Sequence, residues 1–331
     1  MSSAAARPRV QWRDVDGILL LDKPLALSSN QALQQARRLF RACKAGHTGS
    51  LDPLASGLLP LCFGEATKVS GFLLDADKHY VARLVLGART TTGDAEGEVV
   101  ARAPIPPLDA AAVARALAGF VGRQRQVPPM YSALKRDGRP LYELARAGIE
   151  VERDAREVEI LRLDLLALGE DSLEFEVECS KGTYVRTLGE DIARALGTEG
   201  HLVALRRTAI GALDGYRAWT LEELSALAAR GESELDAALL PIDAGLDWPA
   251  ETLDDVRVSD VLHGRAVPVG IPDAAHARLR DAAGRLVALA AVQSGRAAPF
   301  RVIAPARSLT IEPEPQRKGA SSSAPEGERS S

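Results

Sequence analysis

The sequence predicts an α+β fold with a small second domain. Segments with the two-residue period of strands and segments with the period of amphipathic helices both occur, but without the regular spacing of strand–helix–strand units. The chain has 331 residues, enough for about two domains. Its composition, 46% hydrophobic and 26% charged, is typical of a soluble globular protein.

The first domain is expected to begin with a strand and a helix. Residues 17–22 form a short apolar run that ends at Lys23-Pro24, which predicts a buried strand followed by a turn. Ser28 and Gln31 have the spacing of a capping box, so a helix is expected to follow Ser28. Its apolar side chains fall on one face and its arginines on the other.

Four further elements are predicted in this domain. Strands are expected over residues 79–86 and 173–179, and the second of these alternates strictly between apolar and charged residues. Helices are expected over residues 110–120 and 185–196. A turn at Lys181-Gly182 joins the second strand to the second helix.

The last third of the chain divides into three segments of different composition. Residues 220–250 indicate a helix followed by an acidic connection. Short β-like runs at 285–289 and 300–303 alternate with glycine turns, which predicts a small β-rich domain over residues 251–312. Residues 313–331 are rich in proline, serine, glycine and charge, a composition typical of disorder.

Several classes of protein are disfavoured by composition. The three cysteines are far apart with no C-x-x-C pair, and the five histidines show no H-E-x-x-H spacing, so neither a disulfide framework nor a metal site is expected. No apolar run approaches the roughly 20 residues of a membrane span, and the N-terminus lacks the apolar core of a signal peptide. We therefore expect a cytoplasmic protein.

The charge is unevenly distributed along the chain. The net charge is −4, but residues 219–255 carry ten acidic residues against Arg230 alone, a net of −9, so the remainder carries +5. Residues 31–51 hold four basic residues and no acid, and residues 115–156 hold nine basic residues against five acids. This segregation is compatible with a basic face for a phosphate backbone and equally with charged, solvated helices.

The segment most informative about function is residues 46–60, where one carboxylate stands among glycines, small hydroxyls and apolar residues. That carboxylate is Asp52, and Pro53 follows it, so Asp52 is a candidate cap for a helix that begins at Pro53. A single acid close to basic side chains can also act as a nucleophile or a base. The segment lacks the G-x-x-x-x-G-K-[ST] pattern of a phosphate-binding loop.

Seven blocks of sequence, taken together and in order, resemble the TruB family of tRNA pseudouridine synthases. They are GILLLDKP (17–24, followed by SSN at 28–30), AGHTGSLDPLASG (45–57), GEATK (64–68), DKHY (77–80), PMYSALK (129–135), CSKGTYVRT (179–187) and LRR (205–207). The resemblance implies a catalytic domain on a mixed sheet over residues 15–250, with an RNA-clasping insertion at about 127–156. It also implies a PUA-like C-terminal domain over 251–312. Residues 1–14 are expected to form a flexible N-terminus.

The activity implied is the isomerisation of uridine 55 in the T-loop of tRNA to its C5-glycoside, an isomerase reaction that needs no cofactor. The target base lies inside a folded loop, so it has to be flipped out. We expect a monomer that binds the T-arm of tRNA and can also assist tRNA folding. No guide RNA, protein partner or membrane is expected to be required. Two alternatives are a guide-dependent relative that modifies ribosomal RNA with protein partners, and an RNA-binding protein that helps tRNA fold and in which catalysis is secondary or lost.

Residue roles follow from the matched positions. Asp52 matches the family's catalytic aspartate, Arg186 the arginine that pairs with it, and Tyr80 the tyrosine that stacks on the target base. His47 matches a residue that supports the RNA, whereas Tyr184 and Leu205 match the lining of the uracil pocket. Without the resemblance, Tyr184 and Leu205 read as core residues and Arg186 as a solvent-facing one. The basic residues expected to contact RNA are Arg37, Arg41, Lys44, Lys135 and Arg136.

Overall fold

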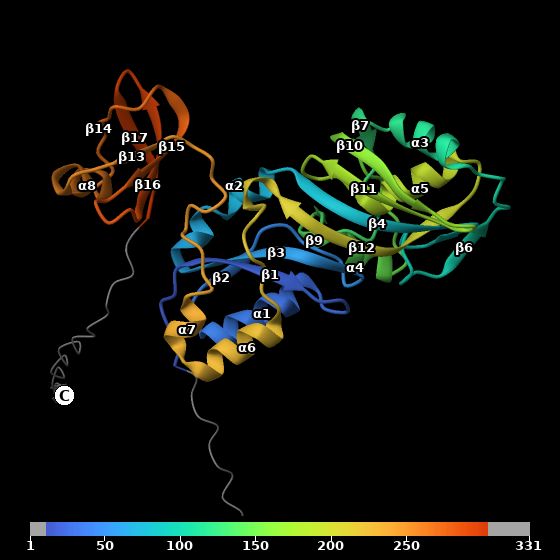
Figure 1. Cartoon of the computed structure of the whole chain (residues 1–331), viewed down its shortest axis with the longest axis horizontal. Coiled ribbons are helices and arrows are strands. Elements are labelled where there is room, and N and C mark those ends of the chain that lie inside the picture. Colours follow the sequence, from blue (N-terminus) through green and yellow to red (C-terminus); the bar gives the residue numbers. More distant parts are fainter. Residues whose placement is uncertain (1–10, 304–331) are drawn as a thin grey trace, which may run out of the picture.

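The computed structural model describes residues 11–303, which contain one large sheet and a smaller C-terminal one (Figure 1). Within these residues the large sheet has eight strands, of which β3 and β12 pair in parallel and the others antiparallel. In spatial order the strands are β1 (Gly17–Lys23), β3 (Ala55–Phe63), β12 (Gly200–Ile210), β4 (Lys78–Leu86), β11 (Ser172–Cys179), β10 (Arg156–Leu168) and β7 (Gly122–Gln126), while β2 (Ala45–His47) pairs with β3. The predicted α+β fold on a mixed sheet is confirmed.

Helices pack on the sheet in two groups (Figure 1). One group, α1 (Ser29–Phe40), α6 (Leu221–Arg230) and α7 (Glu232–Asp236), lies beside β1 and β3. The other, α3 (Ala110–Ala118) and α5 (Val185–Ala195), covers the half formed by β12, β4 and β10. Other small elements are α2 (Ser70–Asp75), the 3-10 helices η1 (Gly64–Lys68) and η2 (Gly211–Leu213), and the hairpin of β5 (Ala88–Thr90) and β6 (Val99–Arg102).

Local sequence signals account for several of these elements. The capping box of Ser28 and Gln31 forms as predicted and starts α1, and the residue after the helix, Arg41, caps it in a left-handed conformation. The alternating run predicted over 173–179 is the strand β11, paired antiparallel with β4 along its whole length. The predicted helix over 185–196 is α5. These predictions are confirmed.

One local prediction is wrong: no helix begins at Pro53. Asp52 and Pro53 form a turn closed by a hydrogen bond from the Ala55 amide to the Asp52 carbonyl (3.0 Å), and the chain then enters strand β3. The run from Ala55 to Phe63 is apolar and almost entirely buried between β1 and β12. Burial of this run as a strand outweighs the helix-start preference of an Asp-Pro pair.

Two long strands, β10 and β12, had no clear signal in the sequence. β10 shifts register between Ile160 and Arg162 and again between Leu165 and Ala167. β12 shifts register against β4 in two places as well. Such bulges break the two-residue alternation from which a strand is predicted.

β3 and β12 approach each other closely at Gly57. Gly57 has φ +98°, and a Cβ there would lie 2.2 Å from the carbonyl oxygen of Arg207. Because no other residue type fits this contact, Gly57 allows the parallel pairing that brings Arg207 beside the Asp52 loop.

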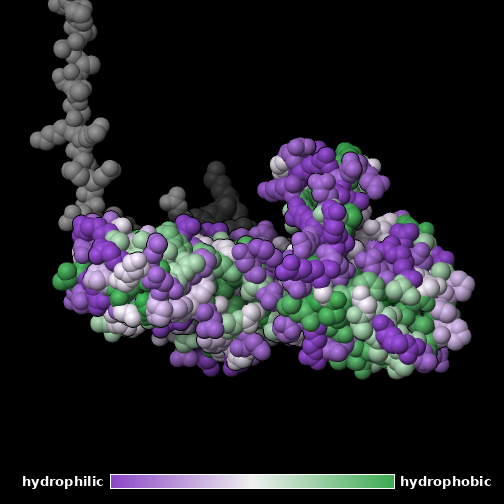
Figure 2. Space-filling view, turned by 90° about the horizontal axis from the view of Figure 1, so that it is seen from above, coloured by the Kyte–Doolittle hydropathy of each residue, from purple (hydrophilic) through white to green (hydrophobic). Residues whose placement is uncertain are grey.

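The segment predicted as an insertion leaves the sheet after β7 and returns at β10. Its base is the ladder pair of Gln126 and Arg156. It contains β8 (Lys135–Arg136), β9 (Arg139–Pro140) and α4 (Leu141–Arg146). Figure 2, which shows the molecule from above, has a largely hydrophilic protrusion that rises from the body. Along the horizontal axis, which the two views share, this protrusion lies where Figure 1 shows β9 and α4.

The C-terminal sheet confirms the predicted small β-rich domain. Its five strands in spatial order are β13 (Ala250–Thr252), β15 (Ala274–Arg280), β16 (Leu286–Gln293), β17 (Arg296–Val302) and β14 (Val267–Pro268), packed with helix α8 (Asp255–Leu262). Phe72 of α2 contacts this part of the chain through Trp248 and Phe300, with ring centroids 4.9 and 6.1 Å apart. The Lys68 ammonium donates to the Val302 carbonyl.

The predicted N-terminal and C-terminal tails lie mostly outside the described residues, which exclude 1–10 and 304–331. Within the segment predicted to be flexible, Trp12 and Arg13 have partners: Arg37 stacks over the Trp12 ring at 4.6 Å, and Arg13 pairs with Glu232 and Asp236. Among residues 11–303, no helix is both long and apolar enough to cross a bilayer.

Candidate active site

A cavity of about 390 Å³ opens between the Asp52 loop, the start of α5 and the strands β4 and β12. Five of the six residues predicted to be catalytic or substrate-binding line it: Asp52, Tyr80, Tyr184, Arg186 and Leu205. They come from four different segments of the chain, so their convergence is a property of the fold. His47 does not line this cavity; it lies on β2, at the other end of the loop that carries Asp52.

The Arg186 side chain is the centre of the site. It is only 6% exposed, which excludes the solvent-facing alternative, and its Nε lies 2.9 Å from Asp52 Oδ2. Its Nη1 donates to the Thr92 carbonyl and its Nη2 to the Tyr131 carbonyl, both at 2.7 Å. The buried carboxylate of Asp94 lies 3.6 Å from Nη1. The guanidinium is therefore held from several sides and presents Nε to Asp52.

The environment of Asp52 acts on its ionisation in opposite directions. Burial raises the pKa of Asp52, the Arg186 guanidinium lowers it, Asp94 raises it, and the Lys23 ammonium lowers it. The net effect is a pKa above that of an ordinary aspartate. A carboxylate with such a pKa beside a fixed cation in a cavity is the pattern of a functional acid or base.

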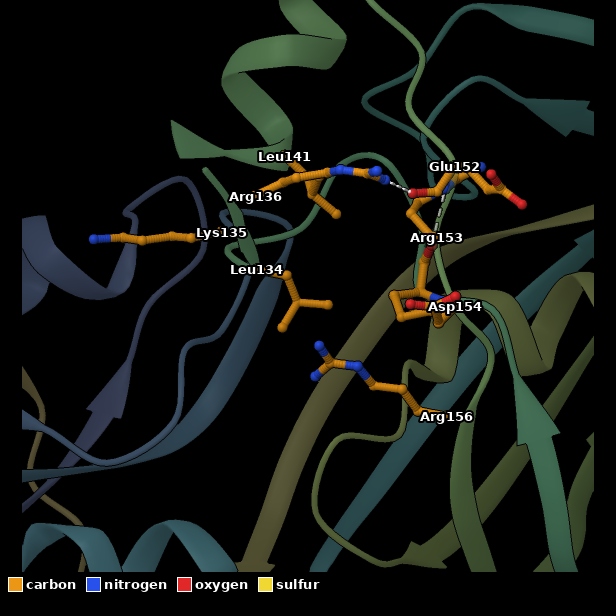
Figure 3. Close-up of a pocket in the computed structure, with 9 residues that line it drawn as sticks. Leu134, Lys135, Arg136, Leu141, Glu152, Arg153, Asp154 and Arg156 are labelled. Atoms are coloured by element: carbon orange, nitrogen blue, oxygen red, sulfur yellow. Dashed lines mark hydrogen bonds between the residues drawn. The ribbon is translucent and has the colours of Figure 1, made fainter. Parts of the chain in front are cut away.

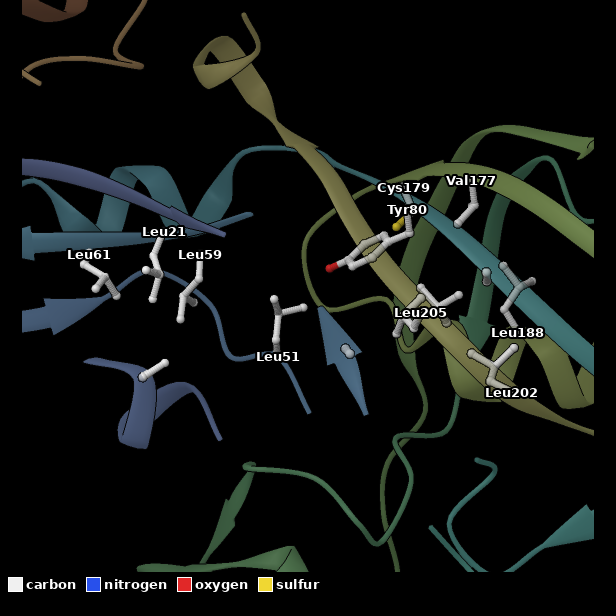
Figure 4. Close-up of a cluster of buried hydrophobic side chains, with 14 of the residues drawn as sticks. Leu21, Leu51, Leu59, Leu61, Tyr80, Val177, Cys179, Leu188, Leu202 and Leu205 are labelled. Atoms are coloured by element: carbon white, nitrogen blue, oxygen red, sulfur yellow. The ribbon is translucent and has the colours of Figure 1, made fainter. Parts of the chain in front are cut away.

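Tyr80 projects from β4 into the cavity next to Leu205 (Figure 4). Its ring lies between Cys179 and Leu51, and its hydroxyl points toward the side of Leu51 (Figure 4). Burial raises the pKa of the Tyr80 hydroxyl, which therefore stays protonated at neutral pH. The ring offers an apolar face for stacking, with a hydroxyl that can exchange a proton.

Tyr184 and Leu205 are placed by backbone contacts. Tyr184 directly precedes α5, and its backbone amide and carbonyl both bond to the side chain of Gln126. Leu205 sits on β12 opposite Ala55 of β3 and Ala82 of β4, where the sheet floors the cavity.

His47 is kept neutral by its surroundings. Burial lowers the pKa of His47, and the nearby Arg207 guanidinium lowers it further. Its Nδ1 is buried without a hydrogen-bond partner in the part of the chain that the structure describes.

The basic residues predicted to contact RNA differ in how free their charges are. Arg37 donates to the carbonyls of Ala42 and Cys43, and Arg41 pairs with Glu232. The acidic segment thus neutralises part of this basic face. Arg136 donates to the Glu152 carbonyl, whereas the side chains of Lys44 and Lys135 are exposed.

Sequence reasoning gave no role to three residues that support the site. Arg207 is 1% exposed and donates to the Leu58 and Gly49 carbonyls beneath the Asp52 loop. Its place in the LRR block was the only signal for it. The others are Asp94 and Gln126. Lys23, which belongs to the GILLLDKP block, also acts on Asp52, and burial lowers the pKa of its ammonium to about 8.

Comparison with known proteins agrees with this geometry. Residues 37–185 match the family described as "TruB family pseudouridylate synthase (N terminal domain)", and residues 186–247 match "tRNA pseudouridylate synthase B C-terminal domain". A tRNA pseudouridine synthase B of Burkholderia mallei is 53% identical over 311 residues, covering 92% of this chain and 99% of the relative. One of Marinomonas sp. is 48% identical over 299 residues, covering 89% and 97%.

Solved structures support the fold. The structure described as "Crystal Structure of a Cbf5-Nop10-Gar1 Complex" superposes with a TM-score of 0.68 at 24% identity, covering 91% of this chain and 92% of that one. A second, an H/ACA RNP bound to a substrate RNA, gives 0.67 at 22% identity, with 87% and 85% covered.

The fold and the matched sequences define the class of protein: the chain is a pseudouridine synthase, an isomerase. Within this class it belongs to the TruB family of tRNA pseudouridine synthases.

Proposed function

We propose that this enzyme isomerises uridine 55 in the T-loop of tRNA, with Asp52 as the catalytic carboxylate acting on a flipped base. The observation that carries the proposal is the Asp52–Arg186 pair, 2.9 Å apart, at a cavity whose wall includes Tyr80. The cavity's volume of about 390 Å³ is within the range of small-ligand sites, roughly 300–1,000 Å³.

The residues that line the cavity support this proposal. A flipped uracil needs a flat apolar surface, which Tyr80 and Leu205 offer in place of the lost base stacking. Asp52 can add to the sugar, add to the base or remove a sugar proton. Each of these roles requires the ionised carboxylate, and Arg186 favours that form.

A second, cationic cavity of about 480 Å³ lies in the insertion and shares Leu134 with the first. Its charged lining consists of Lys135, Arg136, Glu152, Arg153, Asp154 and Arg156, four positive and two negative charges. The Arg156 guanidinium lies below Leu134, and Lys135 extends outward (Figure 3). In residues 11–303 the guanidinium of Arg156 has no hydrogen bond or ion pair. We assign a tRNA phosphate to this cavity.

The site of reaction is tested with a tRNA transcript tritiated at uridine C5. Because C5 takes over the glycosidic bond, its hydrogen must leave, so each turnover releases one tritium. The purified chain alone should release label, and mapping should place the product at the single T-loop uridine 55. Release only in the presence of a guide RNA or protein partners would favour the guide-dependent alternative, and no release would favour an RNA-binding protein without catalysis.

Replacement of Arg156 by alanine should weaken tRNA binding in a salt-dependent way. If its guanidinium binds a phosphate, the slope of log Kd against log salt should fall by about one unit. Titrations at several salt concentrations measure this slope. Arg123 on β7 is a matched control, since its exposed side chain pairs with Glu157 and Glu159 outside the cavity. Equal slopes for Arg156→Ala and the unchanged enzyme would rule out the phosphate contact.

A further inference from the structure

Gln126 makes two hydrogen bonds to the backbone of a single residue. Its Oε1 accepts from the Tyr184 amide at 2.8 Å, and its Nε2 donates to the Tyr184 carbonyl at 3.1 Å. Gln126 ends strand β7 and is 4% exposed. A buried side-chain amide that pairs with both backbone groups of one residue fixes the position and the rotation of that residue.

Tyr184 is the residue from which α5 starts. No side chain caps this helix start, so the usual local anchor is missing. Arg186 stands in the first turn, two residues beyond Tyr184, and its Nε must reach Asp52. A shift of Tyr184 therefore displaces the backbone that carries Arg186 relative to Asp52.

Gln126 also lies at the base of the insertion. Its ladder partner is Arg156, the first residue of β10, so the chain leaves the sheet and returns to it at this pair. Just beyond Gln126, the Tyr131 carbonyl accepts from Arg186 Nη2 at 2.7 Å. The segment that opens the insertion therefore contacts the start of α5 twice, once at the backbone and once at the guanidinium.

We propose that Gln126 is a positioning residue that holds the start of α5 so that Arg186 meets Asp52, and that it ties this geometry to the insertion. The inference rests on the proposed function, in which Asp52 and Arg186 carry the reaction. Gln126 itself lies behind the cavity wall and does not line the cavity. Misplacement of a catalytic group by about 1 Å can cost roughly a hundredfold in rate.

The test is the variant Gln126→Met, which keeps the length of the side chain and removes both hydrogen bonds. The matched control is Gln124→Met on the same strand, because the Gln124 amide donates to the Phe120 carbonyl, away from α5. In Gln126→Met the single-turnover rate should fall about tenfold to a hundredfold, with the Kd for tRNA changed less than about threefold. Gln124→Met should behave like the unchanged enzyme.

The pH profile separates positioning from a loss of folded protein. A smaller folded fraction lowers the rate equally at every pH. Displacement of Arg186 instead leaves Asp52 with the carboxylates of Asp94 and Glu96 and the Lys23 ammonium as its charged neighbours, so the acid limb of the single-turnover rate should move to higher pH. An unchanged rate, an equal fall in Gln124→Met, or a fall without movement of the acid limb would each overturn the inference.

Asp52→Asn in the same assay keeps the two proposals apart. Turnover by Asp52→Asn would refute the proposed function itself. An inactive Asp52→Asn together with full activity of Gln126→Met would refute only the positioning role.

Discussion

Asp52→Asn should abolish isomerisation and leave tRNA binding nearly intact. The substitution keeps the shape of the side chain but removes the charge that every open role of Asp52 requires. We expect the rate of tritium release to fall by at least about a thousandfold, since loss of a nucleophile or base has effects of this order or larger. Binding rests on phosphate and shape contacts along the RNA, so the Kd should change by less than about threefold.

A matched control is available on the same sheet. Asp22 of β1 also pairs with an arginine, Arg206, at 2.8 Å, but the pair lies outside the cavity. Asp22→Asn should therefore keep full activity. Substantial turnover by Asp52→Asn, or an equal loss in Asp22→Asn, would contradict the role given to Asp52.

Arg186→Met should lower both stability and activity. The substitution leaves the Asp94 carboxylate, 3% exposed, without its cation. Removal of one partner from a buried ion pair typically costs about 3–5 kcal/mol, so we expect the free energy of unfolding, measured in urea, to fall by this amount. The exposed pair of Arg194 and Asp191 on the same helix is the control, where Arg194→Met should cost less than about 1 kcal/mol.

The double variant Arg186→Met with Asp94→Asn identifies the cause. If the buried charge of Asp94 is responsible, neutralising it should restore a large part of the lost stability. No recovery would show that the lost contacts of Arg186 with Thr92 and Tyr131 dominate instead.

We expect Arg186 also to influence the pH range of activity. The sign follows from the ionised form of Asp52: burial raises the pKa of Asp52 and Arg186 lowers it, so a weaker partner leaves less carboxylate at a given pH. Arg186→Lys loses the planar guanidinium but keeps a positive charge. We expect measurable turnover, with the acid limb of the pH–rate profile at higher pH than in the unchanged enzyme. An acid limb that does not move would show that Asp52 does not control the pH profile.

The elements that the sequence predicted well are those encoded by neighbouring residues. The capping box of Ser28 and Gln31 and the alternating run that became β11 carry their signals within a few positions. β3 was misread because its signal, Asp52-Pro53, describes a helix start equally well. β10 and β12 were not predicted because their bulges, which depend on the partner strands, interrupt the alternation of apolar and polar residues.

The same distinction between local sequence and tertiary structure applies to the candidate site. The sequence by itself determined the class of chemistry, because the ordered blocks around Asp52, Tyr80 and Arg186 are specific to one family of enzymes. Only the tertiary structure decided how Asp52 is controlled. The carbonyls of Thr92 and Tyr131 and the amide of Gln126 act through hydrogen bonds between segments some 55 to 94 residues apart. Such bonds depend on where the folded backbone passes, and the local pattern of side chains does not encode them.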